Sequence, residues 1–265
     1  MCNYHMHATF SDGKNTPEEV VQAAIEKGFT SVGISEHGYT GFDLRYCMQD
    51  EEGYFSEMSR LKSKYKDKIE IYTGVEEDIY SWVDRDKYDY IIGSVHYFYK
   101  GSQYYPLDSN YDYFKKCLEV YEYDVEMMAE DFFSSFCKYV KERRPDMLGH
   151  YDSITKFDEL DTSLFLENPA YHKIAEKYTK VIADYGCMFE VNTGAMARGF
   201  RNNPYPNENL LYILKQKEAR LVLASDAHSI ELIDFGFAET RKYLRDIGFR
   251  YAYMRLHNQW EKYEL

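Results

Sequence analysis

Two histidines separated by one residue, in the segment Tyr4-His5-Met6-His7, constrain this chain more than any other feature. Successive side chains of a β-strand point to opposite faces, so a strand here places His5 and His7 on one face and turns Met6 into apolar packing. Two imidazoles on one face can bind one metal ion. Because an H-x-H pattern arises often by chance, an edge strand that merely carries two histidines explains the segment equally well on its own.

The rest of the chain repeats a unit of one strand and one helix. Predicted strands cover residues 4–7, 30–35, 69–75, 88–95, 146–149, 188–191, 221–224 and 249–254, and predicted helices cover residues 16–27, 51–66, 111–144 with a break near Asp124, 170–185, 204–217 and 232–247. The tyrosine-rich stretch from His96 to Asp108 is predicted to be a long loop over a substrate site. Strands that alternate with helices predict parallel β-α units.

Polar residues follow seven of the predicted strands. In a β/α barrel the functional groups collect at the carboxyl ends of the strands, whereas an open α/β sheet gathers ligands only at a switch point in its strand order. Seven polar strand ends therefore predict a barrel closed around one central site. A length of 265 residues suits one such barrel, so we expect residues 1–265 to form a single domain.

Composition narrows the classes of partner. The chain has 32 Lys and Arg against 45 Asp and Glu, a net charge of −13, which disfavours non-specific binding to nucleic acid and to anionic membranes. No apolar run approaches the roughly 20 residues that span a bilayer. Five cysteines without C-x-x-C spacing, and the lack of a charged and apolar leader before the first strand, predict a cytoplasmic protein. The sequence does not determine the oligomeric state.

Nine side chains with nitrogen or oxygen ligand atoms lie at the predicted strand ends or just beyond them: His5, His7, Asp12, His37, Glu76, His96, His150, Asp226 and His228. The set contains no thiolate, which suits Zn, Mn or Fe, and it is too large for one ion. The other two histidines, His172 in a predicted helix and His257 in the polar tail, are predicted to lie at the surface.

Six short motifs contain most of these ligands: His5-Met6-His7, Ser35-Glu36-His37, Gly74-Val75-Glu76, Gly93-Ser94-Val95-His96, Gly149-His150-Tyr151-Asp152 and Ser225-Asp226-Ala227-His228. In their order and spacing they resemble the polymerase-and-histidinol-phosphatase family, called PHP, over nearly the whole chain. The resemblance implies a distorted seven-stranded β/α barrel with three divalent metal ions. It places His5, His7, Glu76 and Asp226 around one ion, Glu76, His96 and His150 around a second, and Asp12, His37 and His228 around a third.

Four further features resemble the histidinol-phosphate phosphatases of that family: Glu190-Val191-Asn192-Thr193-Gly194-Ala195, Arg198-Gly199-Phe200-Arg201, Pro204-Tyr205-Pro206 and Gly236-Phe237. The resemblance implies hydrolysis of L-histidinol phosphate, a small phosphate monoester of histidine biosynthesis. Clustered divalent ions suit this reaction, because they neutralise phosphoryl oxygens and supply hydroxide at neutral pH.

Individual roles follow from this interpretation. The expected catalytic residues are Glu76, His96 and Asp226. The expected substrate-binding residues are Arg198, Arg201 and Asn192, with the arginines as planar donors to phosphate. Asp152 is either a hydrogen-bond partner for a ligand histidine or an ordinary turn acid. The candidates to contact the amine and the ring of the leaving group are Glu36, Asp108, Tyr97, Phe98 and Tyr105.

Two alternatives stay open. A phosphoesterase of the same fold could act on a nucleotide or a short oligonucleotide, although the acidic charge disfavours it. A non-catalytic barrel that binds metal and serves as a binding module is the other alternative, since a fold alone does not prove activity. Missing ligands would indicate such a barrel, and here all nine positions carry competent side chains.

Overall fold

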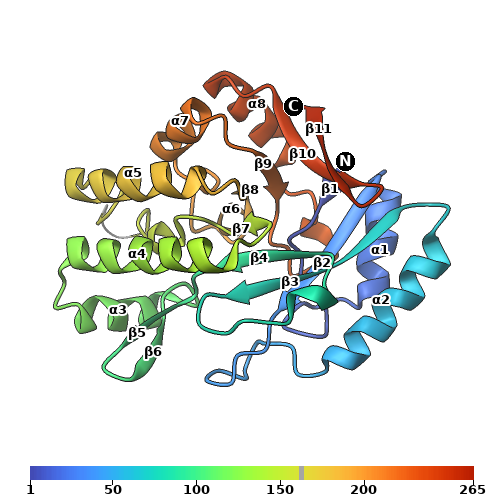
Figure 1. Cartoon of the computed structure of the whole chain (residues 1–265), viewed down its shortest axis with the longest axis horizontal. Helices are drawn as coiled ribbons and strands as arrows, with labels where there is room; N and C mark the ends of the chain where they lie inside the picture. The colour runs from blue at the N-terminus through green and yellow to red at the C-terminus, as the bar shows by residue number, and fades with distance from the viewer. Residues whose placement is uncertain (161–163) are drawn as a thin grey trace.

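Seven parallel strands form a nearly closed barrel at the centre of the computed structural model, which describes residues 1–160 and 164–265 (Figure 1). In sheet order they are β1 (Cys2–Asn3), β2 (Ser31–His37), β3 (Glu70–Asp78), β4 (Tyr90–Ser94), β7 (Met147–Leu148), β8 (Met188–Asn192) and β9 (Leu221–Ala224). Each strand pairs in parallel with the next one in this order. The predicted seven-stranded β/α barrel is confirmed.

The segment with the two histidines lies at the seam of the barrel. The strand predicted at residues 4–7 is wrong in its bounds, because β1 ends at Asn3 and Met6 makes an isolated parallel bridge to Ala227. The His7 amide donates to the Ala227 carbonyl at 2.9 Å, and the Met6 carbonyl accepts from β2 at 2.9 Å. The segment therefore fills the gap between β2 and the end of β9, and both of its histidines are buried.

The helices lie around the outside of the barrel, where Figure 1 shows α1 and α2 on one side and α3, α4 and α5 on the other. Their bounds are α1 (Pro17–Glu26), α2 (Glu51–Tyr65), α3 (Tyr111–Val120), α4 (Val125–Arg143), α5 (Pro169–Ala183), α6 (Gly194–Ala197), α7 (Glu208–Gln216) and α8 (Phe237–Ile247). Thr16 and Glu19 form a capping box at the start of α1, and Asp124 caps α4. The predicted break near Asp124 is thus confirmed. Among the described residues, no helix is long and apolar enough to cross a membrane.

The tyrosine-rich stretch was predicted to be a loop, but it forms an antiparallel hairpin of β5 (Tyr97–Lys100) and β6 (Gln103–Pro106). The turn at Gly101 and Ser102 has positive φ at both residues, which closes the hairpin tightly. The Leu107 amide then donates to the His96 carbonyl at 2.9 Å. The hairpin therefore returns the chain to the end of β4.

A second hairpin, β10 (Tyr251–Leu256) and β11 (Gln259–Glu264), covers the amino end of the barrel. The strand predicted at residues 249–254 belongs to this hairpin and not to the barrel. Trp260 packs edge-on against Tyr4, with ring centroids 5.2 Å apart. The amino end is thus filled by aromatic rings, which leaves the carboxyl ends of the strands for polar chemistry.

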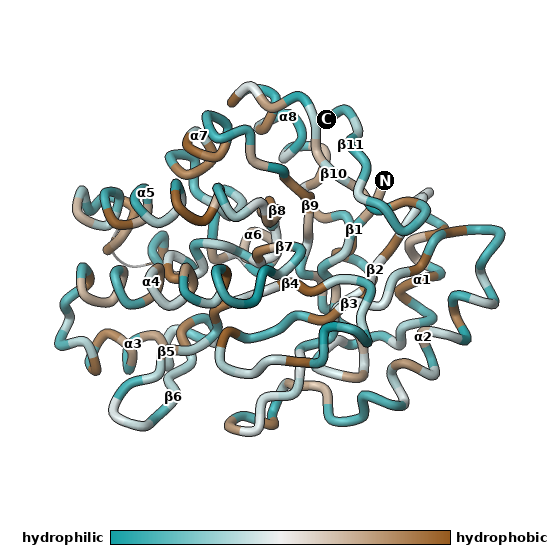
Figure 2. Tube along the Cα trace, viewed as in Figure 1, coloured by the Kyte–Doolittle hydropathy of each residue, from teal (hydrophilic) through white to brown (hydrophobic). Residues whose placement is uncertain are grey.

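The hydropathy of the chain differs between the barrel strands and the helices around them. Figure 2 shows a hydrophobic β9 among the strands of the barrel and a largely hydrophilic α2 at the surface. In α2 the buried residues are Tyr54, Met58, Leu61 and Tyr65. Their spacing of three or four residues is the one expected for a helix that buries a single stripe against a sheet.

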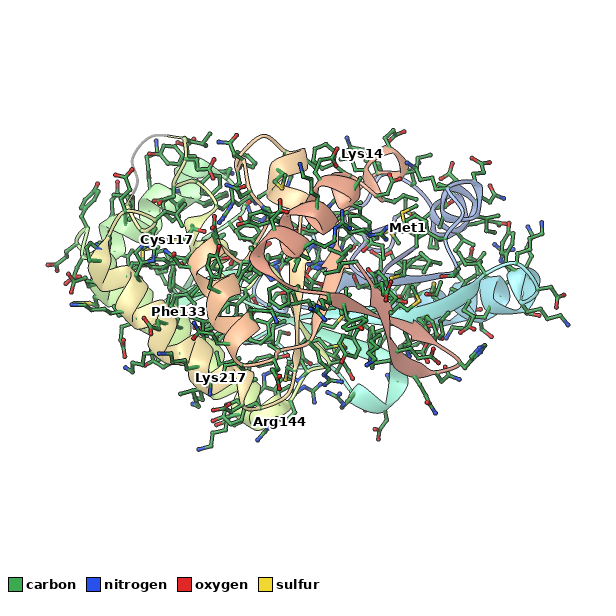
Figure 3. The ribbon with its side chains drawn as sticks, turned by 90° about the horizontal axis from the view of Figure 1, so that it is seen from above. Met1, Lys14, Cys117, Phe133, Arg144 and Lys217 are labelled. Atoms are coloured by element: carbon green, nitrogen blue, oxygen red, sulfur yellow. The ribbon has the colours of Figure 1, made fainter. Side chains whose placement is uncertain are left out.

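The two ends of the barrel can be compared in Figure 3. Arg144 and Lys217, which follow α4 and α7 and precede β7 and β9, lie at one edge of the molecule. Lys14, in the loop after the two histidines, lies at the opposite edge. This is the edge at which the strands end and the polar side chains gather.

Close packing around Tyr90 predicts that residue 74 must be glycine. A Cβ at Gly74 would lie 2.1 Å from the Tyr90 ring, and the Tyr90 hydroxyl is held by a 2.6 Å bond to the Tyr4 carbonyl. We expect Gly74→Ala to lower the free energy of unfolding by about 1–3 kcal/mol through overpacking. Urea denaturation measures this change. Gly41→Ala, at an exposed glycine with nothing nearer than 3.6 Å, is the control and should change it by less than about 0.5 kcal/mol.

Candidate metal centre

The Glu76 carboxylate, near the end of β3, lies at the centre of a group of five imidazoles. Its Oε2 lies 3.1 Å from His5 Nε2, 2.9 Å from His37 Nδ1 and 3.5 Å from His7 Nε2. Its other oxygen, Oε1, lies 3.1 Å from His96 Nε2 and 2.9 Å from His150 Nε2. Each oxygen therefore faces a different set of histidines, as a carboxylate that bridges two ions would.

Asp226 follows β9 and supplies a second carboxylate to the same region. Its Oδ1 lies 3.3 Å from His7 Nε2 and 3.6 Å from His5 Nε2. Its Oδ2 accepts a hydrogen bond of 2.7 Å from Arg198 Nη2. One oxygen of Asp226 thus faces the histidine pair at the seam, while the other orients an arginine.

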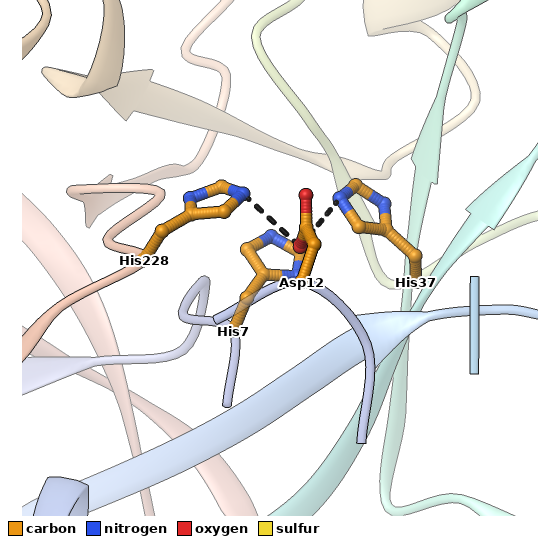
Figure 4. A group of neighbouring side chains, drawn as sticks. All are labelled: His7, Asp12, His37 and His228. Carbon is orange, nitrogen blue, oxygen red and sulfur yellow. Dashed lines mark ion pairs between the residues drawn. The ribbon is translucent and has the colours of Figure 1, made fainter. Parts of the chain in front are cut away.

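A third group surrounds Asp12, in the loop after the histidine pair. Figure 4 shows Asp12 between His37 and His228, with His7 beside them. The Asp12 Oδ1 atom lies 3.6 Å from His37 Nε2 and 3.3 Å from His228 Nε2. The rings of His7 and His37 are stacked with centroids 4.1 Å apart. One carboxylate oxygen and three imidazoles therefore converge on one small volume.

The structure brings together all nine predicted ligands. Ligand atoms within 4.8 Å of one another define overlapping groups: His5, His7 and Asp226; His5, Glu76 and His150; His37, Glu76 and His96; His7, Asp12, His37 and His228; and His96, Asp108 and His150. Asp108, predicted only as an acid at the rim, joins the last group. His172 is half-buried on α5 and His257 is exposed, so both lie outside the centre.

Several buried polar atoms in the centre make no hydrogen bond within the described chain, although they lie close to other ligand atoms. His5 Nε2, both ring nitrogens of His7, His37 Nδ1 and Glu76 Oε2 accept or donate no hydrogen bond there. Unpaired buried polar atoms are rare in folded proteins because each one costs free energy. Divalent ions would satisfy these atoms, and the donor set of imidazoles and carboxylates is the one that zinc, manganese and iron bind.

The pKa shifts of His7, Glu76 and Asp12 favour the protonation states that bind metal, whereas the pKa values of His5, His96 and His228 are raised because nearby carboxylates outweigh the effect of burial. Burial, reinforced by the neighbouring His37 and His228, lowers the pKa of His7 to about 3. Burial opposes ionisation of Glu76, but the surrounding histidines hold the pKa of its carboxyl well below the ordinary value. Asp12 behaves in the same way, with its pKa lowered by His37 and His228 against the effect of burial. Neutral imidazole and ionised carboxylate are the forms that bind metal.

Glu190, on β8, supports two of the ligand histidines through its carboxylate. Its carboxylate lies 2.8 Å and 2.9 Å from His5 Nδ1, and it accepts from the His150 amide at 3.3 Å. Such a contact fixes the orientation and tautomer of a metal-binding imidazole. The sequence contained a signal for this role, because Glu190 lies two residues before Asn192 and thus on the same face of the strand.

Asn192, predicted to bind substrate, supports this carboxylate instead of lining the pocket. Its Nδ2 donates to Glu190 at 3.0 Å, and its Oδ1 accepts from the Gly194 amide at 2.8 Å. The side chain is fully buried. This geometry links the end of β8 to the start of α6 and leaves the side chain away from the mouth.

A pocket of about 560 Å³ opens above the centre. Outside the ligand histidines its lining includes Asp43, Arg45, Tyr46, Tyr97, Asp108, Lys156 and Arg198. Lys156 was not predicted, because a lysine six residues after a ligand histidine forms no motif. Its Nζ donates to the Asp108 carbonyl, and burial lowers the pKa of Lys156 to about 8, with Asp108 opposing the shift.

The two predicted arginines have different positions. Arg198 lines the pocket, whereas Arg201 is buried outside its lining and donates to Thr155 Oγ1 and, at 3.2 Å, to the Asn203 carbonyl. Arg201 Nη1 also lies 3.9 Å from Asp152 Oδ2. A guanidinium used in this way positions the loop between β8 and α7 and does not face the pocket.

Among the described residues, Asp152 forms no hydrogen bond or ion pair with a ligand histidine. Its Oδ2 accepts from the Asn207 amide at 3.1 Å and from Asn207 Nδ2 at 2.8 Å. The interpretation as a partner for a ligand histidine is therefore wrong, and Asp152 serves the turn before α7. The motif showed its distance from His150 along the chain but not the direction of its side chain.

Of the five residues predicted to contact the leaving group, two line the pocket and three do not. Tyr97 and Asp108 line the pocket. Phe98 packs in the hydrophobic core, and the Tyr105 hydroxyl donates to Gln103 at 2.9 Å, away from the lining. Glu36 is fully buried under the loop of residues 8–13 and is not part of the pocket.

Residues 3–194 match the PHP domain, and this chain belongs to the PHP domain family. The match covers the seam, β2, β3, β4, β7 and β8 with most of the predicted ligands. The family predicted from the six motifs is confirmed.

Curated relatives extend the likeness to nearly the whole chain. The probable histidinol-phosphatase of Schizosaccharomyces pombe is 27% identical over 254 residues, which cover 87% of this chain and 81% of the relative. The histidinol-phosphatase of Bacillus subtilis is 28% identical over 258 residues, which cover 88% of this chain and 95% of the relative. The crystal structure of the Lactococcus lactis histidinol phosphate phosphatase, complexed with zinc, L-histidinol and phosphate, has a TM-score of 0.72 at 20% identity over 98% of each chain. At that identity the structural likeness shows the barrel fold.

The contact between Glu190 and His5 predicts a defect in metal affinity. Glu190→Gln keeps one acceptor near His5 Nδ1 but removes the carboxylate, so we expect metal affinity to fall by about 10–100-fold. Calorimetric titration of metal-free protein with Zn²⁺ measures the change. Glu26→Gln, exposed at the end of α1, is the matched control and should bind like the wild type. Equal affinity in Glu190→Gln and wild type would contradict a supporting role.

Proposed function

We propose that this chain is a metal-dependent phosphomonoesterase that hydrolyses L-histidinol phosphate to L-histidinol and phosphate in histidine biosynthesis. The observation that carries the proposal is the convergence of nine metal-ligand side chains below a pocket that also contains Lys156 and Arg198. The named relatives support the substrate. We further propose that residues 1–265 act as a single domain in the cytoplasm and bind neither nucleic acid nor membrane, in line with the net charge of −13.

The centre is proposed to hold three divalent ions, of zinc, manganese or iron. His5, His7, Glu76 and Asp226 would hold the first, Glu76, His96 and His150 the second, and Asp12, His37 and His228 the third. The grouped ligand atoms contain the third set whole and three members of the first, His5, His7 and Asp226. The second set is supported by the distances from Glu76 Oε1 to His96 and His150. When bound, such ions neutralise phosphoryl oxygens and lower the pKa of water to near neutrality. Glu76, His96 and Asp226 are the catalytic residues of the proposal because they hold the ions next to the pocket.

Arg198 and Lys156 are proposed to bind the phosphoryl group. The Arg198 guanidinium is anchored on Asp226 by a 2.7 Å bond and still reaches the pocket. Lys156 stands beside it and uses one of its hydrogens on the Asp108 carbonyl. Two neighbouring cations suit a dianion better than a neutral ligand. Arg201 and Asn192 support this site from outside the pocket.

The leaving group is proposed to lie between Tyr97 and Asp108. The Asp43 carboxylate is already paired, since Arg45 Nε donates to it at 2.8 Å and the Tyr97 hydroxyl at 2.8 Å. Asp108 is therefore the acid better placed to receive the amine of the substrate. The tyrosine rings of Tyr46 and Tyr97, with centroids 6.2 Å apart, give an aromatic wall for an imidazole.

The substrate prediction is tested by comparing kcat/KM on L-histidinol phosphate, an aryl phosphate, AMP and a short oligonucleotide with one metal present throughout. We expect L-histidinol phosphate to lead by about 100-fold, equivalent to roughly 2.7 kcal/mol of transition-state binding. Asp108→Asn should reduce this preference, because the amide no longer pairs with the amine. A higher kcat/KM for AMP or the oligonucleotide would contradict the assignment and favour a nucleotide phosphoesterase.

The two cations proposed to bind the phosphoryl group, Lys156 and Arg198, give a further prediction. Lys156→Met and Arg198→Lys should each lower kcat/KM by about 10-fold or more, the latter because lysine lacks the planar donor fork. The loss should be similar for L-histidinol phosphate and the aryl phosphate, since both substrates share the phosphoryl group. Arg250→Lys, at an exposed position, should retain wild-type kinetics. A loss confined to L-histidinol phosphate would place the cation at the leaving group instead.

A further inference from the structure

We propose that Glu36 is a positioning residue that holds the loop of residues 8–13 in the shape that presents Asp12 to a metal ion. The inference rests on the proposed three-ion centre and assigns a task to a carboxylate next to the ligand His37. Glu36 lies on β2, and its side chain is fully buried. It is absent from the pocket lining, which excludes direct contact with a substrate there.

The Glu36 carboxylate joins two points of the loop. The Ala8 amide lies 3.1 Å from each of its oxygens, and the Ser11 hydroxyl donates to Oε2. Ala8 directly follows the ligand His7, and Ser11 directly precedes Asp12. The Glu36 side chain therefore holds the first and the last residue of the segment between His7 and Asp12, the two proposed metal ligands.

The loop is a tight turn that its own backbone hydrogen bonds close. The Ser11 and Gly13 amides both donate to the Ala8 carbonyl, at 3.2 Å and 3.0 Å. A Cβ at Gly13 would lie 2.2 Å from the His7 carbonyl oxygen, so only glycine fits there. The Ala8 amide points inward, and without Glu36 it would be a buried donor without a partner, which costs free energy.

Beyond Asp12 the loop is fixed to the last ligand motif. The Lys14 amide donates to the His228 carbonyl at 2.9 Å. Glu36 and His228 thus hold the loop on the two sides of Asp12. The Asp12 side chain itself is about one-third exposed, at 35%, so its placement between His37 and His228 depends on the backbone that carries it (Figure 4). Ligands that are misplaced by about 0.5 Å bind metal poorly.

The experiment counts bound ions and measures their affinities, so it does not depend on activity. Metal-free protein is loaded with Zn²⁺ or Mn²⁺, ions per chain are counted by elemental analysis, and affinities are measured by calorimetry. Wild type should bind three ions and Asp12→Ala two. Glu36→Ala should also bind two under conditions that saturate the wild type, and its melting curve shows whether the barrel remains folded.

Two milder variants separate positioning from general damage. Glu36→Gln should keep three ions, because the amide oxygen can accept from the Ala8 amide while its NH₂ group donates to the Ser11 hydroxyl. Ser11→Ala removes one contact without opening a cavity in the core, and it should weaken the third ion about 10-fold. Glu26→Gln is the surface control and should match the wild type in every measurement.

The outcomes that overturn the inference are distinct from those that overturn the proposed function. Three ions with wild-type affinities in a folded Glu36→Ala would overturn it. If Glu36→Ala does not fold, an unchanged third affinity in Ser11→Ala overturns it instead. Fewer than three ions in the wild type would remove the three-ion centre and this inference together. Lack of wild-type activity on L-histidinol phosphate, with three ions in the wild type and the expected loss of one ion in Asp12→Ala and Glu36→Ala, would overturn only the substrate.

Discussion

The burial of one carboxylate among imidazoles is the interaction on which the other parts of this structure depend. Taking the Glu76 charge out of water costs several kcal/mol unless partners compensate it. The compensation comes from histidines on the seam and at the ends of β2, β4 and β7, so each of these segments must reach the same point. Closure of the barrel and assembly of the site are therefore one requirement.

The fold could be predicted because strand ends and ligands coincide in the sequence. The polar residues after the strands identified the carboxyl face, and the helical spacing in α2 and the break near Asp124 identified helices. The hairpin of β5 and β6 and the exclusion of β10 from the barrel could not be predicted. Alternation describes one strand at a time, whereas pairing depends on which other strand presents free amides.

The parts of the candidate site that depend only on the type of residue could be predicted from the sequence. Histidines and acids at strand ends identified the nine side chains that converge. Arg201 and Lys156 show where this reasoning ends, because both are cations close in space to the same turn, yet only Lys156 faces the pocket. The direction of a side chain in a loop follows from tertiary contacts such as that of Arg201 with Thr155, which no local pattern records.

The isolated bridge between Met6 and Ala227 gives the barrel its weakest edge, because a single pair of residues replaces a ladder of hydrogen bonds. His7 and Asp226 stand on the two sides of this edge, with 3.3 Å between His7 Nε2 and Asp226 Oδ1. An ion held by both would act as a cross-link between the beginning and the end of the chain, closing a very long loop. Metal supply would then govern folding as well as chemistry, since a ligand that binds only the folded state stabilises it in proportion to the logarithm of its concentration.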